Sequence, residues 1–185
     1  MTISDSASPA EYTPAGYSSV APWVVTDDTG ALLDFIAYAF DGDELSRVQT
    51  EDGLIGHAEI RVGDTVVLAF DRRPEWPPMP SLLRVWVADA DAAFGRATER
   101  GAAVVTHLGD NAFGQRGGRI KDPLGNIWWV TQQVETVPED VMWQRLQQPE
   151  YAENMRYAQE SLDAELSGAV GGRSSAPRQG GADQL

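Results

Sequence analysis

The chain contains no cysteine and only one lysine, Lys121, among its 185 residues. Without cysteine there are no disulfide bonds and no thiolate chemistry, which is consistent with a reducing compartment. No apolar run reaches the roughly 20 residues that a membrane-spanning helix needs. Residues 1–19 have neither a basic start nor an apolar core, so they do not resemble a secretory signal. We therefore expect a cytoplasmic protein with no membrane partner.

Positive charge is scarce throughout, because the formal net charge is −14 at pH 7. Nucleic-acid phosphates need a basic surface for binding, so nucleic acid is not an expected partner. An acidic surface attracts cationic molecules, although acidity also serves solubility alone. The expected partner is a small-molecule ligand, and a cationic ligand stays open.

One structural unit occurs twice in the sequence: a strand, an amphipathic helix and three further strands, the last two joined by a tight turn. The turn is Gly63-Asp64 in the first copy and Asp122-Pro-Leu-Gly in the second. Asp89 is the expected N-cap of the second helix. The strands are expected near residues 20–26, 44–49, 56–62, 65–70, 82–88, 103–107, 113–120 and 126–132.

These patterns predict an α+β protein made of two βαβββ modules, residues 20–71 and 82–134, joined by a proline-rich linker. The flanking residues 1–19 are expected to form a flexible arm. A C-terminal helical extension is expected over residues 138–166, interrupted at Pro149, followed by a disordered tail at 167–185. The helical piece after Pro149 carries an apolar stripe from Tyr151 to Leu166. This stripe is expected to pack on its own domain or on a twofold-related subunit, as in a homodimer.

The duplicated unit resembles the vicinal oxygen chelate superfamily, which includes glyoxalase I, extradiol dioxygenases and the fosfomycin and bleomycin resistance proteins. The resemblance rests on the matching helix openings that follow Trp23 and Val85, and on the late sequence Asp122-Pro-Leu-Gly-Asn-Ile-Trp-Trp-Val. Gly56-His-Ala-Glu-Ile-Arg-Val-Gly-Asp is most similar to the glyoxalase/bleomycin resistance subgroup. The resemblance implies a curled mixed sheet around a central cup, with helices outside and ligand inside.

Metal-dependent members of that superfamily carry metal ligands on the first and fourth strands of each module. Aligning the two modules places these positions at Val20, Val67, Leu82 and Trp129. A divalent metal needs several N, O or S ligands, and none of these side chains supplies one. We therefore expect neither a metal nor another cofactor.

Alternation along the strands predicts which side chains face the cup. Ala58 and Ile60 belong to the apolar face of their strand, so His57 and Glu59 lie on the other face. The same argument turns Arg84 away from the core. Aromatic walls with a few polar groups are typical of a small-molecule site. The residues expected to bind ligand are Trp86, Trp129, Arg84, Gln115, Arg119 and Val67.

Two functions fit this prediction. The first is a metal-free protein that sequesters or carries an apolar or aromatic ligand, as bleomycin resistance proteins do by resemblance. The alternative is a metal-independent isomerase, lyase or cyclase with His57 and Glu59 as its catalytic acid–base pair. His57 and Glu59 are equally explained as solvated cross-strand neighbours. A pure interaction module is less expected, because this fold forms a cavity.

Overall fold

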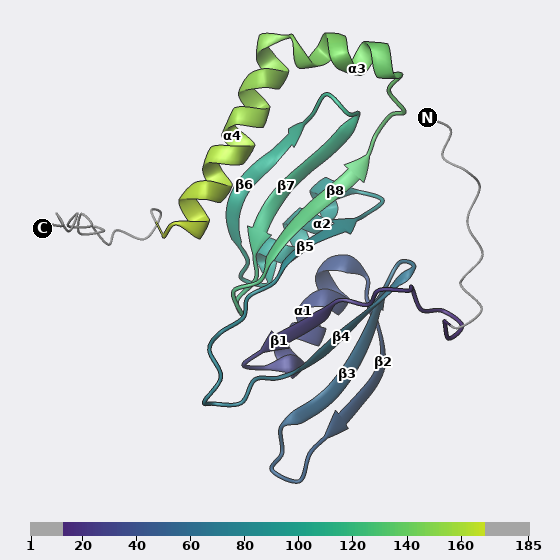
Figure 1. Cartoon of the computed structure of the whole chain (residues 1–185), viewed down its shortest axis with the longest axis vertical. Coiled ribbons are helices and arrows are strands. Elements are labelled where there is room, and N and C mark those ends of the chain that lie inside the picture. The colour runs from purple at the N-terminus through teal and green to yellow at the C-terminus, as the bar shows by residue number, and fades with distance from the viewer. Residues whose placement is uncertain (1–12, 169–185) are drawn as a thin grey trace, which may run out of the picture.

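Two βαβββ modules follow one another along the chain, and two helices complete it (Figure 1). The computed structural model describes residues 13–168. The first module comprises β1 (Trp23–Thr26), α1 (Thr29–Phe40), β2 (Asp43–Gln49), β3 (Ile55–Val62) and β4 (Thr65–Asp71). The second comprises β5 (Leu82–Trp86), α2 (Ala90–Glu99), β6 (Ala103–Asp110), β7 (Gln115–Lys121) and β8 (Ile127–Gln133). Helices α3 (Glu139–Leu146) and α4 (Pro149–Leu166) follow, so the predicted α+β class is confirmed.

Each module forms its own open four-stranded mixed sheet, and the two sheets have the same topology. The strand orders are β1-β4-β3-β2 and β5-β8-β7-β6. In each sheet the first strand pairs in parallel with the fourth, and the other pairs are antiparallel. The hairpin turns contain Gly63 and Gly125 with φ of 58° and 95°, a conformation that glycine adopts without steric cost. The sequence repeat is therefore a repeat of structure.

Helices α1 and α2 each begin where an aspartate side chain caps them. Asp28 Oδ1 accepts a hydrogen bond of 2.8 Å from the backbone N–H of Ala31 in α1. Asp89 Oδ1 accepts one of 3.0 Å from Ala92 in α2, as the sequence predicts. Each cap satisfies a backbone donor that has no partner inside the helix. The third helix begins at Glu139, one residue after the predicted start, and Pro149 is the first residue of α4.

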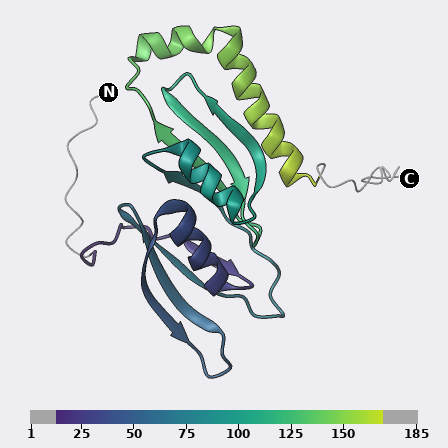
Figure 2. The same cartoon turned by 180° about the vertical axis from the view of Figure 1, so that it is seen from behind.

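The modules join through their helical faces, as seen from behind in Figure 2. One apolar core runs through both modules, and the rings of Phe40 and Trp128 lie 5.0 Å apart within it. Arg96 on α2 donates hydrogen bonds of 2.9 Å to the carbonyls of Tyr38 and Ala39, at the C-terminal end of α1. A cation is favourable there, because the C-terminal end of a helix carries the partial negative charge of the helix dipole. This packing leaves the opposite faces of both sheets available for other contacts.

The expected flexible arm and disordered tail fall largely outside the described residues, which exclude 1–12 and 169–185. Within residues 13–168, no helix is both long and apolar enough to cross a membrane.

Candidate functional site

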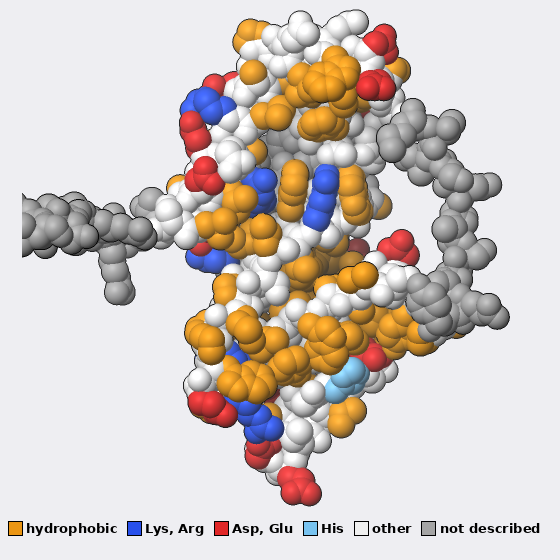
Figure 3. Space-filling model, in the orientation of Figure 1, with side chains coloured by type: hydrophobic (Ala, Val, Ile, Leu, Met, Phe, Trp, Pro, Cys, Tyr) orange, Lys and Arg blue, Asp and Glu red, His pale blue; other side chains and the backbone are white. Residues whose placement is uncertain are grey.

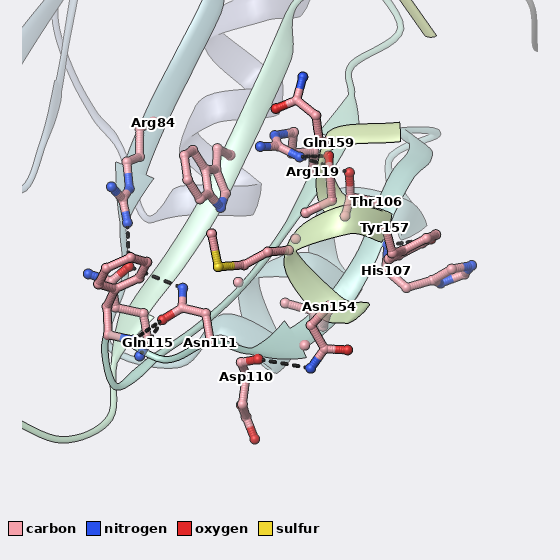
Figure 4. Close-up of a pocket in the computed structure, with 18 residues that line it drawn as sticks. Arg84, Thr106, His107, Asp110, Asn111, Gln115, Arg119, Asn154, Tyr157 and Gln159 are labelled. Carbon is pink, nitrogen blue, oxygen red and sulfur yellow. Dashed lines mark hydrogen bonds between the residues drawn. The ribbon is translucent and has the colours of Figure 1, made fainter. Parts of the chain in front are cut away.

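A cavity of about 570 Å³ lies between the second sheet and α4 (Figure 4). Its floor comes from β5, β6, β7 and β8, and one wall comes from α4. Apolar groups of Trp129, Phe113 and Met155 line it together with the polar side chains of Asn111 and Gln115. The volume and the mixture of apolar walls with placed polar groups fit a small-molecule site.

Helix α4 is fastened to the sheet by side chains at both ends of the cavity. Arg119 Nη1 donates to the carbonyl of Ala158 at 2.6 Å, and the hydroxyls of Thr106 and Ser161 lie 2.7 Å apart. At the other end, Asn154 Nδ2 donates to the carbonyl of Asp110 at 3.1 Å. Figure 4 shows the hydrogen bond between Asn154 of α4 and Asp110 of β6. The cavity wall is therefore fixed by hydrogen bonds.

The floor carries an alternating ladder of aromatic rings and guanidinium groups. Strand pairing aligns Arg84 with Trp129, and Trp129 with Arg119. The Arg84 guanidinium carbon lies 4.2 Å from the ring centroid of Trp86 and 4.3 Å from that of Trp129. Arg119 lies 4.6 Å from the Trp129 centroid. Figure 3 shows orange and blue side chains alternating in a row across the middle of the molecule. Each contact is a cation–π interaction, which stiffens the floor.

Arg119 is buried, whereas Arg84 is exposed and only partly desolvated. Burial lowers the pKa of Arg84, and burial together with the nearby charge of Arg84 lowers the pKa of Arg119. Arg119 is 8% exposed. Arg84 Nη2 donates to Gln115 Oε1 at 2.8 Å, and Arg84 Nε donates to Thr131 at 3.3 Å. Neither guanidinium forms an ion pair with a carboxylate of the described residues.

Glycines make room above the floor. Gly109 and Gly117 are paired across β6 and β7 and both line the cavity. A Cβ atom at Gly117 would lie 2.8 Å from the carbonyl oxygen of Val130, so no larger residue fits without a shift. A Cβ atom at Gly109 would meet nothing within 4 Å. The space above Gly109 is thus open cavity.

Comparison with known proteins identifies the family. The sequence profile of the Glyoxalase/Bleomycin resistance protein/Dioxygenase superfamily matches residues 17–130, well over half of the chain. The chain belongs to this superfamily. The match covers the first module and the second as far as the middle of β8.

Individual proteins of known sequence or structure are also similar to this chain. An uncharacterised protein of Mycobacterium tuberculosis, Rv0887c, is 35% identical over 133 residues, covering 66% of this chain and 78% of the relative. The structure of TioX from Micromonospora sp. ML1 is 27% identical with a TM-score of 0.51, covering 65% of this chain and all of TioX. TnmS3, an antibiotic binding protein from Streptomyces sp. CB03234, is 25% identical with a TM-score of 0.48, covering 62% of this chain and 96% of TnmS3.

The metal that this superfamily resemblance implies does not fit the residues present. Strand pairing aligns Trp23 with Leu68, and Arg84 with Trp129, on the first and fourth strands of the two modules. None of these four side chains is a metal ligand. Residues 13–168 also contain no group of three or more His, Asp or Glu side chains close enough to hold a metal ion. No step of a mechanism can therefore be assigned to a protein-bound metal at these positions.

The structure brings together four of the six residues predicted to bind ligand: Arg84, Gln115, Arg119 and Trp129 line the cavity. Trp86 stands at the end of the ladder and is 53% exposed. Val67 must be corrected, because it pairs with the core residue Ile60 and is itself buried in the core. By strand pairing, Leu68 rather than Val67 corresponds to Trp129, so the sequence registration was one residue off.

His57 and Glu59 lie on β3 of the other sheet and do not line this cavity. Their side chains meet, with 3.0 Å between His57 Nε2 and Glu59 Oε1. Tyr17 donates a hydrogen bond of 2.6 Å to Glu59, and hydrogen bonds from Tyr17 and His57 lower the pKa of Glu59. A smaller cavity of about 320 Å³ lies on this first module, lined by Trp23 among others. The pair is therefore a separate feature of the molecule.

Sequence reasoning missed the residues that α4 contributes to the cavity. Asn154, Met155, Tyr157 and Gln159 all line it. The apolar stripe of this helix indicates that one face is buried, but the stripe does not indicate which surface covers it. Asn111 was also missed, and its position in the loop before β7 carries no periodic signal.

Proposed function

We propose that the protein is a metal-free binding protein that sequesters or carries an apolar or aromatic small molecule. The observation that carries this proposal is the cavity between α4 and the second sheet, about 570 Å³ in volume and lined by Trp129, Phe113 and Met155. A cavity of this size suits a drug-sized molecule. Membership in a superfamily named partly for bleomycin resistance proteins supports a binding role of the resistance type.

The titratable side chains of the cavity favour binding over chemistry. Arg84 and Arg119 lack an adjacent base, and His107 and Asp110 are exposed at the rim. The alternative enzyme would use His57 and Glu59, which lie on the other sheet away from this cavity. A cationic ligand is disfavoured, because it would face two guanidinium groups. We retain a homodimer and a cytoplasmic location as parts of the proposal, testable by sedimentation velocity and by cell fractionation.

Fluorescence titration with N-phenyl-1-naphthylamine tests the binding function. This neutral two-ring dye becomes brighter in apolar surroundings, and bound dye should also quench the emission of Trp129. We expect saturable one-to-one binding, with the dye recovered chemically unchanged. His57→Ala and Glu59→Gln should bind the dye as the wild type does. The absence of saturable binding would overturn the proposal, and dye altered by the wild type but not by these variants would favour the enzyme.

A further inference from the structure

The two arginines of the cavity differ from most arginines of the described chain in having no carboxylate partner. Arg72, Arg116 and Arg145, for example, each pair with an aspartate or a glutamate. A buried charge is costly unless it is paired, and Arg119 is more than nine-tenths buried. In a chain with a net charge of −14, carboxylates are plentiful. None of those in residues 13–168 pairs with Arg84 or Arg119, and Asp110, which also lines the cavity, pairs with Arg116 instead.

Several guanidinium donors remain available at the cavity. The two hydrogen bonds of Arg119 both start from Nη1, which leaves its Nε and Nη2 without a partner among residues 13–168. Arg84 donates through Nε and Nη2, so its Nη1 likewise has no partner among residues 13–168. The indoles stack on the guanidinium faces, and such stacking leaves the in-plane N–H groups open. In-plane donors are the groups that bind a carboxylate or sulfonate.

A structural role accounts for only part of this arrangement. Arg119 fastens α4 through the carbonyl of Ala158, but one neutral donor would satisfy that carbonyl without placing a second positive charge beside Arg84. Arg84 donates no hydrogen bond to α4. Two like charges flanking Trp129 repel each other, and an anion at the edge of the ladder would offset part of this repulsion. A bound anion therefore reduces an electrostatic cost that the packing alone leaves in place.

We infer that the ligand of this cavity carries an anionic group, a carboxylate or sulfonate, beside its aromatic ring system, and that Arg84 and Arg119 bind that group. This inference rests on the proposed binding function and names its ligand class. The rings occupy the apolar side of the cavity near Phe113 and Met155, and the anion lies against the edge of the ladder.

Two dyes that differ by one sulfonate test the inference. N-phenyl-1-naphthylamine is neutral, and 8-anilinonaphthalene-1-sulfonate has the same rings with an anionic group. We expect the full-length wild type to bind the sulfonate dye roughly 10- to 100-fold more tightly, because a charged hydrogen bond contributes that much in Kd. Arg84→Met and Arg119→Met should each remove most of this preference. Arg100→Met is the matched control, because Arg100 also stacks on an aromatic ring, that of Tyr38 at 4.1 Å, but does not line the cavity.

The possible outcomes distinguish a failure of the anionic-ligand inference from a failure of the proposed binding function. If neither dye binds, the proposed function fails. If both dyes bind with equal affinity, the function stands and the anionic ligand is wrong. Equal loss of both dyes in Arg119→Met would mean that this residue only positions α4. Arg84→Met then decides, since a sulfonate preference that survives this substitution overturns the inference and a preference that disappears supports it.

Discussion

Replacing Gly109 with leucine should fill the cavity without harming the fold. Gly109 lines the cavity on β6, and a Cβ atom there meets nothing within 4 Å. The leucine side chain therefore enters space that ligand would occupy. Its backbone φ is not in the left-handed region, so leucine is conformationally acceptable. Replacing a glycine within a strand also removes an entropic penalty of about 0.5–1 kcal/mol.

The expected result is weaker binding at equal or higher stability. Overpacking typically costs about 1–3 kcal/mol, which is roughly a 5- to 150-fold increase in Kd. Titration with N-phenyl-1-naphthylamine measures the affinity, and thermal unfolding measures the stability. Gly95→Leu is the control, because its Cβ atom on α2 also meets open space and it does not line the cavity. Unchanged affinity in Gly109→Leu would refute the assignment of the cavity as the binding site.

Three further predictions concern other parts of the molecule. Trp129→Ala should weaken dye binding by about 1–2 kcal/mol, roughly 5- to 30-fold, because the aromatic contact with the dye and the cation–π contacts with Arg84 and Arg119 are lost. Trp143→Ala on the exposed side of α3 is the control and should leave the titration curve unchanged. Asp122→Ala should lower the free energy of unfolding, measured by urea denaturation, by on the order of 3–5 kcal/mol. The reason is that this buried carboxylate accepts hydrogen bonds from Leu124, Asn126 and Trp128. Asp64→Ala in the equivalent exposed turn should change the free energy of unfolding by less than about 0.5 kcal/mol. Tyr17→Phe should destabilise the protein at neutral pH, and the difference in stability from the wild type should shrink on acidification. Hydrogen bonds from Tyr17 and His57 lower the pKa of Glu59 in the folded protein. The contribution of ionised Glu59 to stability is therefore present above the ordinary glutamate pKa of about 4.3 and is lost as the pH falls through the lower folded-state pKa. Denaturation midpoints at about pH 7 and about pH 3.5 check this, and a constant difference would show that the charge of Glu59 is irrelevant.

Much of the cavity floor could be predicted from the sequence, because its strands are buried on one face only. Apolar Val85 and Ile120 fix the core side of β5 and β7, which turns Arg84 and Arg119 to the other side. Val67 was assigned instead by aligning the two modules, and strand pairing shows that this alignment is one residue off at β4.

The arrangement of modules and the position of α4 could not be predicted. A repeated module specifies its own sheet, but whether His57 and Arg84 share one cavity depends on how the two modules pack. That packing is set by long-range contacts such as Arg96 with the C-terminal end of α1. The docking of α4 likewise depends on single hydrogen bonds, such as Arg119 to Ala158, which no periodic pattern in the sequence announces.

The most direct test of the cavity as a ligand site is a ¹H–¹⁵N correlation spectrum of the wild-type protein titrated with N-phenyl-1-naphthylamine. We expect the largest shifts at the amides of Gly117, Gly118 and Tyr157, which lie on the floor and the α4 wall. Gly56 and Phe70, which line the smaller cavity of the first module, should stay unchanged. Shifts confined to Gly56 and Phe70, or no shifts at saturating dye, would contradict the proposed site.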